Sequence, residues 1–279
     1  MCGFIGLHER DESRLFIVGL GSGGPACHRQ DRLPYSGFSS FLVFTFWLTP
    51  IVFFMVRLVL FDIDGTLIRT SGAGVRAFRE VFRSEFNATD GFENLKFSGR
   101  TDYSLVREFF DFHRVSCSQQ NFERFFDRYV FWLDQILRQS KCEICAGITD
   151  FIEQLQGLST PPLIGLLTGN IRLGAEIKLR HVGLWDPFVT GAFADDHEER
   201  DSIAAAARDR GGRLLNRSLA GEEVLVIGDT PLDIRCARAI DARILAVATG
   251  GSPLAELEAH RPDWAVPDLR QVSPSVVLQ

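Results

Sequence analysis

Residues 57–66 read Arg-Leu-Val-Leu-Phe-Asp-Ile-Asp-Gly-Thr, an apolar run that leads directly into two carboxylates, Asp62 and Asp64. Short runs of aliphatic and aromatic residues that end at Gly, Asp or Thr are typical of strands buried in a parallel sheet. Ligands of open α/β sheets bind beyond the carboxyl ends of such strands. We therefore expect a strand at 58–61, with Asp62 and Asp64 in a site at its carboxyl end.

The remainder of this part of the chain alternates apolar runs with amphipathic stretches. Further apolar runs cover 163–167, 188–193, 224–227 and 244–248, and helical patterns cover 174–181, 201–210 and 231–240. Parallel strands need long crossover connections, which are usually helices. The alternation therefore predicts an α/β fold with a doubly wound parallel sheet.

A long interval between the first two apolar runs breaks this alternation. Apolar residues recur there at three- and four-residue steps, as in amphipathic helices, over 75–86, 102–112 and 118–138. Gly72 and Gly74 stand at one junction of the interval and Gly147 stands near the other, where they would serve as hinges. The chain would then divide into an inserted helical cap at 72–147 and a core formed by 55–71 and 148–279.

Two later runs also end in polar residues, Thr168-Gly-Asn170 and Asp229-Thr230. Because the carboxyl ends of parallel strands share one edge, Thr168 and Asp229 should converge with Asp62 and Asp64. A single Asp in such a place is often only a turn residue or a helix N-cap. Several crowded carboxylates, however, repel one another unless a cation lies among them. Mg²⁺, a hard cation that takes oxygen ligands, suits this cluster together with a phosphate.

These stretches resemble the motifs of the haloacid dehalogenase superfamily. Asp62-Ile-Asp-Gly-Thr66 resembles the first motif, Leu167-Thr-Gly-Asn170 the second and Gly228-Asp-Thr-Pro-Leu-Asp233 the fourth. The resemblance extends over residues 55–269 and is greatest to phosphoglycolate-phosphatase-like members, whose caps carry stretches similar to Phe97-Ser-Gly-Arg-Thr-Asp102. It implies a Rossmann-like core with strand order 3-2-1-4-5 and an α-helical cap between the first two motifs.

The resemblance, together with the chemistry of carboxylates, implies a role for each motif Asp. Asp62 would attack phosphorus and form an aspartyl-phosphate, and Asp64 would act as general acid and then as general base. Mg²⁺ would be held by the Asp62 carboxylate, the Asp64 backbone carbonyl and Asp229, with Asp233 supporting these ligands. Halide needs no proton in order to leave, so the acid at Asp64 argues against a dehalogenase.

Other residues would bind the substrate. Thr168 and the backbone at Gly65 and Gly169 would contact phosphoryl oxygens, and Asn170 belongs to the same group. Arg100 in the cap would pair with a carboxylate or phosphate of the substrate, unless it is an ordinary surface arginine.

The cationic residue of the third motif departs from the family pattern. Many relatives carry a Lys-Pro pair after the third strand, whereas residues 195–201 read Asp-Asp-His-Glu-Glu-Arg-Asp. Lys178 is the one lysine of the predicted core, and we favour it over Arg200 as the cation that contacts the phosphate and the nucleophile. His181 and His197 are expected to have structural or surface roles, because carboxylates suffice for Mg²⁺.

Composition limits the function further. The chain has 279 residues and a formal net charge of -6 without a Lys/Arg cluster, which argues against nucleic-acid binding. Cys142 and Cys145 form a C-x-x-C pair with no second pair nearby, so unpaired thiols are expected rather than a zinc site. We therefore expect a magnesium-dependent phosphatase for a small phosphorylated metabolite of the phosphoglycolate or sugar-phosphate type. A phosphomutase on the same scaffold and a catalytically silent binding module are the alternatives.

The amino-terminal part does not share this pattern. Residues 1–40 mix Gly, Ser, Pro and charges, and Phe41–Val56 is uncharged and apolar. This stretch is either a membrane anchor or an extension outside the working protein, which would then start at Met55. An anchor that ends at Val56 would join the predicted central strand without a linker, so we favour the second interpretation and a cytoplasmic protein.

Overall fold

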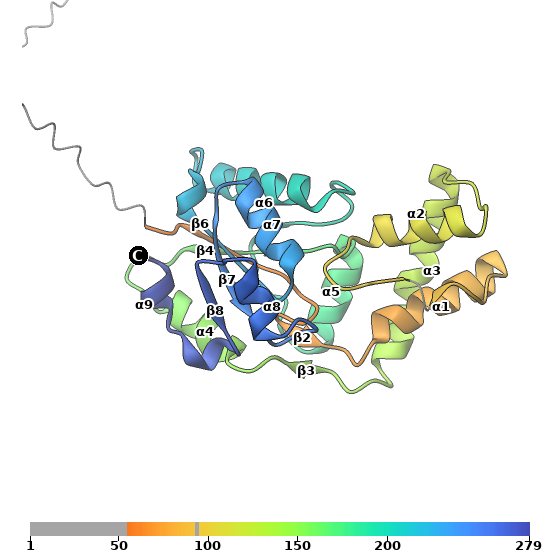
Figure 1. Ribbon diagram of the computed structural model, residues 1–279, viewed down its shortest axis with the longest axis horizontal. Coiled ribbons are helices and arrows are strands. Elements are labelled where there is room, and N and C mark those ends of the chain that lie inside the picture. Colours follow the sequence, from red (N-terminus) through yellow and green to blue (C-terminus); the bar gives the residue numbers. More distant parts are fainter. Residues whose placement is uncertain (1–54, 93–94) are drawn as a thin grey trace, which may run out of the picture. The chain divides into compact units, whose positions relative to one another are not determined.

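A six-stranded parallel sheet forms the centre of the computed structural model, which describes residues 55–92 and 95–279 (Figure 1). The strands lie side by side in the order β5-β4-β1-β6-β7-β8. Their bounds are β1 (Leu58–Phe61), β4 (Leu163–Leu167), β5 (Thr190–Ala192), β6 (Val224–Gly228), β7 (Arg243–Val247) and β8 (Trp264–Val266). The predicted α/β fold and strand order 3-2-1-4-5 are confirmed, and β8 adds an edge strand that the sequence did not predict.

Strand β1 lies in the middle of the sheet, and both of its edges are paired. Phe61 stands beside Leu166 of β4 and Ile227 of β6, and the N–H of Asp62 donates to the carbonyl of Ile227 (2.9 Å). Every residue of β1 is buried, which accounts for its uninterrupted apolar sequence. The strand therefore delivers Asp62 to the carboxyl edge of the sheet.

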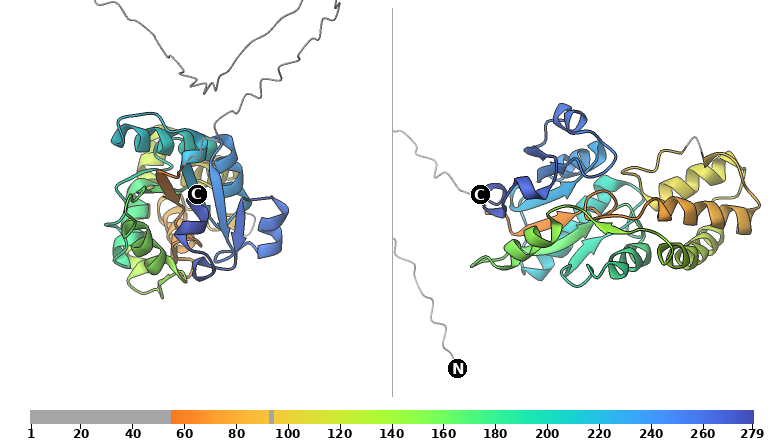
Figure 2. Two further views of the ribbon diagram at one scale, coloured as in Figure 1. Left: turned by 90° about the vertical axis from the view of Figure 1, so that its left-hand side faces the viewer. Right: turned by 90° about the horizontal axis from the view of Figure 1, so that it is seen from below.

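Helices cover both faces of the sheet (Figure 2). They are α4 (Ile148–Gln156), α5 (Arg172–His181), α6 (Arg200–Leu214), α7 (Pro231–Ala239), α8 (Leu254–Ala259) and α9 (Pro274–Val277), with 3-10 turns at Gly221–Glu223 and Leu269–Gln271. Side chains of β1 alternate between the two faces, as in any strand. Val59 and Phe61 pack in a cluster with residues of α4 and α5, whereas Leu58 and Leu60 pack with residues of α6 and α7.

Three further helices form a separate cluster, called the cap below (Figure 1). They are α1 (Ala73–Phe86), α2 (Asp102–Phe112) and α3 (Gln119–Leu137), close to the ranges that the sequence predicts. Their buried faces are rich in aromatic rings, and Phe82 stacks on Phe109 with 3.6 Å between ring centroids. The amphipathic pattern of this interval therefore reflects a small hydrophobic core of its own.

Two short strands connect the cap to the rest of the fold. Strand β2 (Ile68–Arg69) pairs antiparallel with β3 (Glu143–Ile144), so both connections run side by side. Gly147 follows at φ 84°, where a Cβ atom would come within 2.5 Å of the N atom of Arg270. A glycine is therefore required at this junction.

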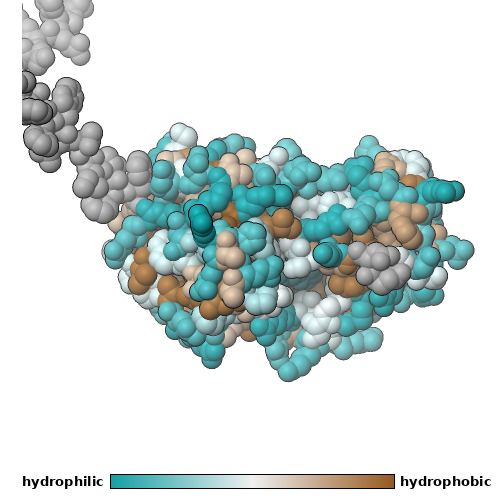
Figure 3. Space-filling model, in the orientation of Figure 1, coloured by the Kyte–Doolittle hydropathy of each residue, from teal (hydrophilic) through white to brown (hydrophobic). Residues whose placement is uncertain are grey.

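The expected apolar extension, residues 1–54, lies outside the described residues. Within the described part of the chain, no helix is both long and apolar enough to cross a membrane. On the face shown in Figure 3, hydrophilic residues surround small, separate groups of apolar ones.

Candidate active site

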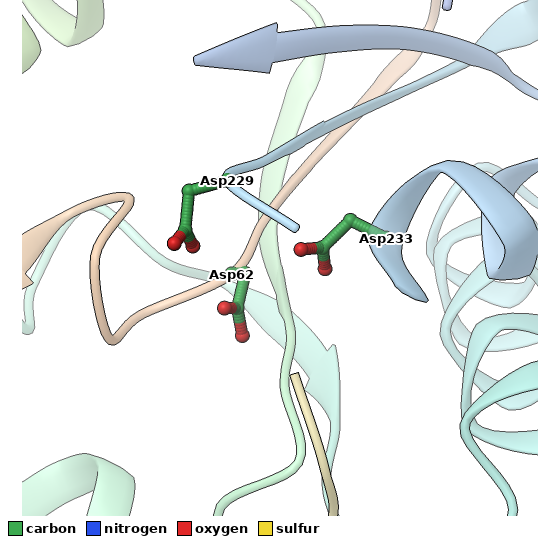
Figure 4. Close-up of side chains that lie close together, drawn as sticks. All are labelled: Asp62, Asp229 and Asp233. Atoms are coloured by element: carbon green, nitrogen blue, oxygen red, sulfur yellow. The ribbon is translucent and has the colours of Figure 1, made fainter. Parts of the chain in front are cut away.

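Three carboxylates meet at the carboxyl edge of the sheet. Asp62 follows β1, Asp229 follows β6, and Asp233 lies in the first turn of α7. One oxygen of each lies within 4.8 Å of the others, and all three residues are buried. Figure 4 shows their side chains turned toward one another. The predicted convergence of Asp62 with Asp229 is thus present in the structure, and Asp233, for which the family resemblance implies a supporting role, lies beside them.

Neighbouring hydroxyl groups hold two of these carboxylates. The Thr66 hydroxyl donates to Asp229 Oδ1 (3.0 Å). Asp233 Oδ2 accepts from the N–H (3.0 Å) and the hydroxyl (2.7 Å) of Thr230, the N-cap residue of α7. Asp233 is therefore fixed by the capping geometry of its own helix, and Asp229 is fixed by a long-range contact with the loop after β1.

Gly65 allows the loop after β1 to lie against Asp229. Its φ is 91°, and a Cβ atom there would come within 2.4 Å of Asp229 Oδ2. Any side chain at this position would collide with the carboxylate cluster. The Asp-Gly-Thr sequence therefore needs a glycine at position 65.

Burial and mutual repulsion disturb the acidity of this cluster. Burial raises the pKa of Asp62 to about 6 against the attraction of Arg200, with Asp233 and Asp64 raising it further. Burial, then Asp233 and Asp62, raise the pKa of Asp229 to about 8. One guanidinium against three carboxylates leaves the cluster short of positive charge.

A divalent cation with oxygen ligands fits this arrangement. The described residues offer carboxylate oxygens and hydroxyls at this point, which is the donor set that Mg²⁺ takes in proteins. Binding it would stabilise the ionised carboxylates of Asp62 and Asp229, whose pKa values are raised by burial and by mutual repulsion.

Arg200, at the start of α6, supplies the cation beside Asp62. Its side chain is buried. One terminal nitrogen lies 3.1 Å from Asp62 Oδ1 and also contacts Asp233. The other terminal nitrogen donates to the carbonyl of Gly99, in the segment before α2 (3.1 Å). We expected Lys178 to contact the nucleophile, and on this point the structure differs. Helix α6 points its first residue at the end of β1, whereas Lys178 lies on α5 behind another carboxylate.

Lys178 is bound to Asp64. Its buried Nζ lies 2.6 Å from Asp64 Oδ2 and donates to Asn170 Oδ1 (2.5 Å). The Asn170 amide in turn donates to Asp64 Oδ2 (2.8 Å) and to the Thr168 hydroxyl (2.9 Å). The Asp64 side chain is therefore not in the carboxylate cluster, although the sequence grouped Asp64 with the metal residues through its backbone carbonyl.

Arg100 lies just before α2, and its side chain contacts residues of that helix. Its guanidinium pairs with Glu108 and donates to the carbonyl of Ser104 (3.2 Å), although the residue also lines the cavity described below. The backbone of the next residues contacts the second motif, because the N–H of Asp102 donates to the carbonyl of Gly169 (2.7 Å).

Asp102 is a buried site residue that sequence reasoning missed. Its Oδ2 accepts from the N–H of Ile171 (2.8 Å), which is the N-cap residue of α5 and has no capping side chain of its own. Burial raises the pKa of Asp102 to about 7, against the attraction of Lys178. In the sequence, Asp102 looks like an ordinary first-turn acid, and nothing indicates its contact with a distant helix.

A cavity of about 380 Å³ opens above these residues, between the sheet and the cap. The sheet side contributes Asp62, Asp64, Thr168 and Asp229, and the cap side contributes residues of α1, α2 and the segment before α2. Within the described residues, Cys117, Cys142, Cys145 and Cys236 form no disulfide bond.

The fold and this carboxylate site define a hydrolase with a Rossmann-like core and a helical cap. The chain belongs to the haloacid dehalogenase-like hydrolase family, whose pattern matches residues 59–247. The family resemblance found in the sequence is thereby confirmed.

Individual relatives are distant. A Clostridium perfringens (strain 13 / Type A) protein named as a candidate pyrophosphatase, PpaX, is 22% identical over 215 residues, which cover 76% of this chain and 93% of the relative. CbbY from Rhodobacter sphaeroides, solved in complex with phosphate, superposes with a TM-score of 0.63 at 17% identity over 80% of this chain and 99% of its own. β-Phosphoglucomutase (PgmB) from Clostridium difficile gives 0.62 at 17% identity, covering 80% and 96%. At such identities these structures share the fold.

Proposed function

We propose that this hydrolase is a Mg²⁺-dependent phosphatase that cleaves a small phosphomonoester through an aspartyl-phosphate on Asp62. The main support for the proposal is that two carboxylates at the end of one strand lie in different environments. Asp62 lies buried beside Arg200 and the carboxylate cluster, whereas Asp64 faces the cavity and is held by Lys178 and Asn170.

In the first step, an oxygen of Asp62 attacks phosphorus and the bond from phosphorus to the alcohol oxygen breaks. Asp64 gives its proton to that oxygen, so the alcohol leaves neutral. In the second step, Asp64 takes a proton from water, the water oxygen attacks phosphorus, and the Asp62 carboxylate and inorganic phosphate are released.

The remaining residues of the site position these groups. Arg200 would steady the Asp62 carboxylate and the phosphoryl oxygens, and Lys178 would hold Asp64 at the leaving oxygen. The Asp62 and Asp229 carboxylates and the Asp64 carbonyl would hold Mg²⁺, and Asp233 would support them. The metal would neutralise charge on the phosphoryl group. Thr168, Asn170 and the backbone at Gly65 and Gly169 would bind its oxygens, and Arg100 would contact the substrate only after leaving Glu108.

A panel of phosphate esters, with inorganic pyrophosphate included, tests the proposal when free phosphate is measured with and without Mg²⁺. We expect Mg²⁺-dependent phosphate release from at least one monoester and none from the Asp62→Asn variant. An isomerised ester with almost no free phosphate would instead indicate a phosphomutase, the activity in the name of the structurally similar PgmB. No reaction with any ester would leave the site as a binding module.

A further inference from the structure

The cavity has two chemically different halves. Its sheet side carries the carboxylates, Lys178 and Arg200, whereas its cap side combines a wall of apolar side chains with the polar side chains of Ser98, Arg100, Asp102 and Tyr129. The four that form this apolar wall are Val75 and Phe78 of α1, Phe97 of the segment before α2, and Leu105 of α2. A phosphoryl group at Asp62 would therefore leave the organic part of the ester facing the apolar wall.

The apolar wall is supported from behind by the aromatic core of the cap. The Phe78 ring makes edge contacts with Phe97 (5.6 Å between centroids), Phe125 (5.0 Å) and Tyr129 (4.8 Å). Phe78 and Leu105 are buried, while Val75 and Phe97 keep part of their surface open to the cavity. The wall thus offers a preformed apolar surface.

The cations that line the cavity already have partners. Arg200 contacts Asp62, Lys178 contacts Asp64 and Arg100 contacts Glu108. Arg69 stands opposite Glu143 in the β2–β3 pair, and its Nε donates to the carbonyl of Thr249 (2.7 Å). A second anionic group on the substrate would compete with these partners for the same cations.

From these observations we propose that the substrate is the phosphate monoester of an alcohol that carries an apolar group, such as an aromatic ring or a branched chain. This inference rests on the phosphatase activity proposed above. The apolar group lies against Val75, Phe78, Phe97 and Leu105 and loses its contact with water there, which favours binding. A carboxylate or a hydroxylated sugar in the same place loses hydration without gaining partners on the wall.

Three esters of primary alcohols test the proposal with the full chain and Mg²⁺: 2-phenylethyl phosphate, ribose 5-phosphate and phosphoglycolate. Their leaving groups are of one type, so differences in kcat/KM report on the cap side of the cavity. We expect kcat/KM for 2-phenylethyl phosphate to exceed both others by about tenfold or more. An equal or higher value for either polar ester would overturn the inference while leaving the phosphatase activity established. If none of the three esters nor any member of the wider panel releases phosphate, the proposed function itself fails.

A variant of the apolar wall links the preference to its residues. Phe97→Ser should reduce the ratio of kcat/KM between 2-phenylethyl phosphate and ribose 5-phosphate by about tenfold, and Phe97→Leu should keep most of it. Phe131→Ala, an exposed aromatic position on α3, serves as the matched control and should not change the ratio. Thermal unfolding of each variant establishes that it folds. An unchanged ratio in a folded Phe97→Ser protein contradicts the assignment of the wall.

Discussion

At the residue scale, the site holds a cluster of three buried carboxylates and a fourth carboxylate, Asp64, and each of its two buried cations contacts a different part of this set. Arg200 contacts Asp62 and Asp233, and Lys178 contacts Asp64. Buried charges that lack full compensation make the folded state sensitive to pH and to metal, because protonation or metal binding relieves their repulsion.

The raised pKa of Asp229 predicts how pH affects the metal-free protein. Its ordinary value is 3.8, and in the fold it rises to about 8. The folded protein therefore holds this proton more tightly than the unfolded chain, and it loses stability as the pH rises from about 4 toward about 8. Mg²⁺ binds the ionised carboxylates, so it should raise the melting temperature more at pH 8 than at pH 5.

Thermal unfolding with EDTA and with Mg²⁺ at both pH values measures this effect. Asp229→Asn should remove most of the Mg²⁺ response, whereas Asp150→Asn, an exposed carboxylate on α4, should retain it. A Mg²⁺ response that is equal at both pH values, or that survives in Asp229→Asn, would count against a metal in this cluster.

The two cations predict different kinetic defects. Lys178→Met should lower kcat about a hundredfold or more for an alkyl phosphate, whose leaving oxygen needs a proton from Asp64. The loss should be much smaller for p-nitrophenyl phosphate, which leaves without a proton. Arg200→Met should lower kcat for both esters to a similar extent, because its guanidinium acts at the nucleophile and the phosphoryl group.

Steady-state kinetics of both variants on both esters distinguish these roles. Arg180→Met, an exposed position on the same helix as Lys178, serves as the control and should behave like the parent protein. Equal losses on both esters for Lys178→Met would remove the link between Lys178 and the leaving group.

The positions of the carboxylates at the sheet edge could be predicted from the sequence, whereas the partners of the two cations could not. Asp62, Asp64 and Asp229 stand directly after apolar strands, and the strand order alone brings them to one edge. Whether Lys178 or Arg200 contacts Asp62 depends on the rotation of two helices about their axes. The weakly amphipathic, Ala-rich sequence of α6 gives no indication that its first residue is buried.

At the scale of elements, the cap completes a helix of the core. Helix α5 begins at Arg172, and the preceding Ile171 has no side-chain acceptor to cap it. Two carboxylates from other segments accept hydrogen bonds from its first N–H groups instead. Asp102 of α2 accepts from the N–H of Ile171, and Asp195 accepts from the N–H of Arg172. Because α5 also carries Lys178, the position of the cap is linked to the group that holds Asp64.

Asp102 substitutions test this link. Asp102→Ala would leave the N–H of Ile171 without its acceptor, so we expect a loss of about 1–3 kcal/mol of stability and a fall in kcat of about tenfold on alkyl phosphates. Asp102→Asn keeps an oxygen acceptor and should restore both. Asp111→Ala on the same helix is the exposed control. Identical kinetics for the Ala and Asn variants, with kcat unchanged, would show that Asp102 has no influence on the site.

The long helices of the cap were predictable, whereas three of the shortest strands were not. Helices of the cap have many turns of apolar periodicity, but β2, β3 and β8 contain two or three residues each. Such segments are held by pairing with strands that are distant in sequence, and their own sequences are too short to show a period. The contact of Asp102 with α5 could not be predicted either, because it joins segments that are distant in the sequence.

At the scale of the whole molecule, the described residues supply all the hydrogen-bonding partners of the first strand. The N–H of Val56 donates to the carbonyl of Leu278 (3.2 Å), and the N–H of Arg57 donates to the carbonyl of Glu223 (2.8 Å). Strand β1 is paired on both edges from Leu58 onward. The first strand therefore needs no partner from residues 1–54.

A protein that starts at Met55 should accordingly fold and match the full chain in kcat/KM per active site. Because Phe41–Phe54 is strongly apolar, we also expect the full chain to aggregate or to partition with membranes more than the shorter protein does. Activity per milligram and sedimentation of both forms measure this. Failure of the shorter protein to fold would show that residues 1–54 contribute to the domain.

If Asp62 carries the phosphoryl group during the reaction, the most direct test is to trap that group there. In Asp64→Asn with p-nitrophenyl phosphate, the leaving group needs no acid, but water lacks its base, so the aspartyl-phosphate should accumulate. After a rapid quench, borohydride reduces an aspartyl-phosphate to homoserine, which peptide mass spectrometry locates. We predict a Mg²⁺-dependent burst of p-nitrophenol and homoserine at position 62, with neither in Asp62→Asn/Asp64→Asn. A burst with homoserine at another aspartate, or with none at position 62, would show that Asp62 is not the nucleophile.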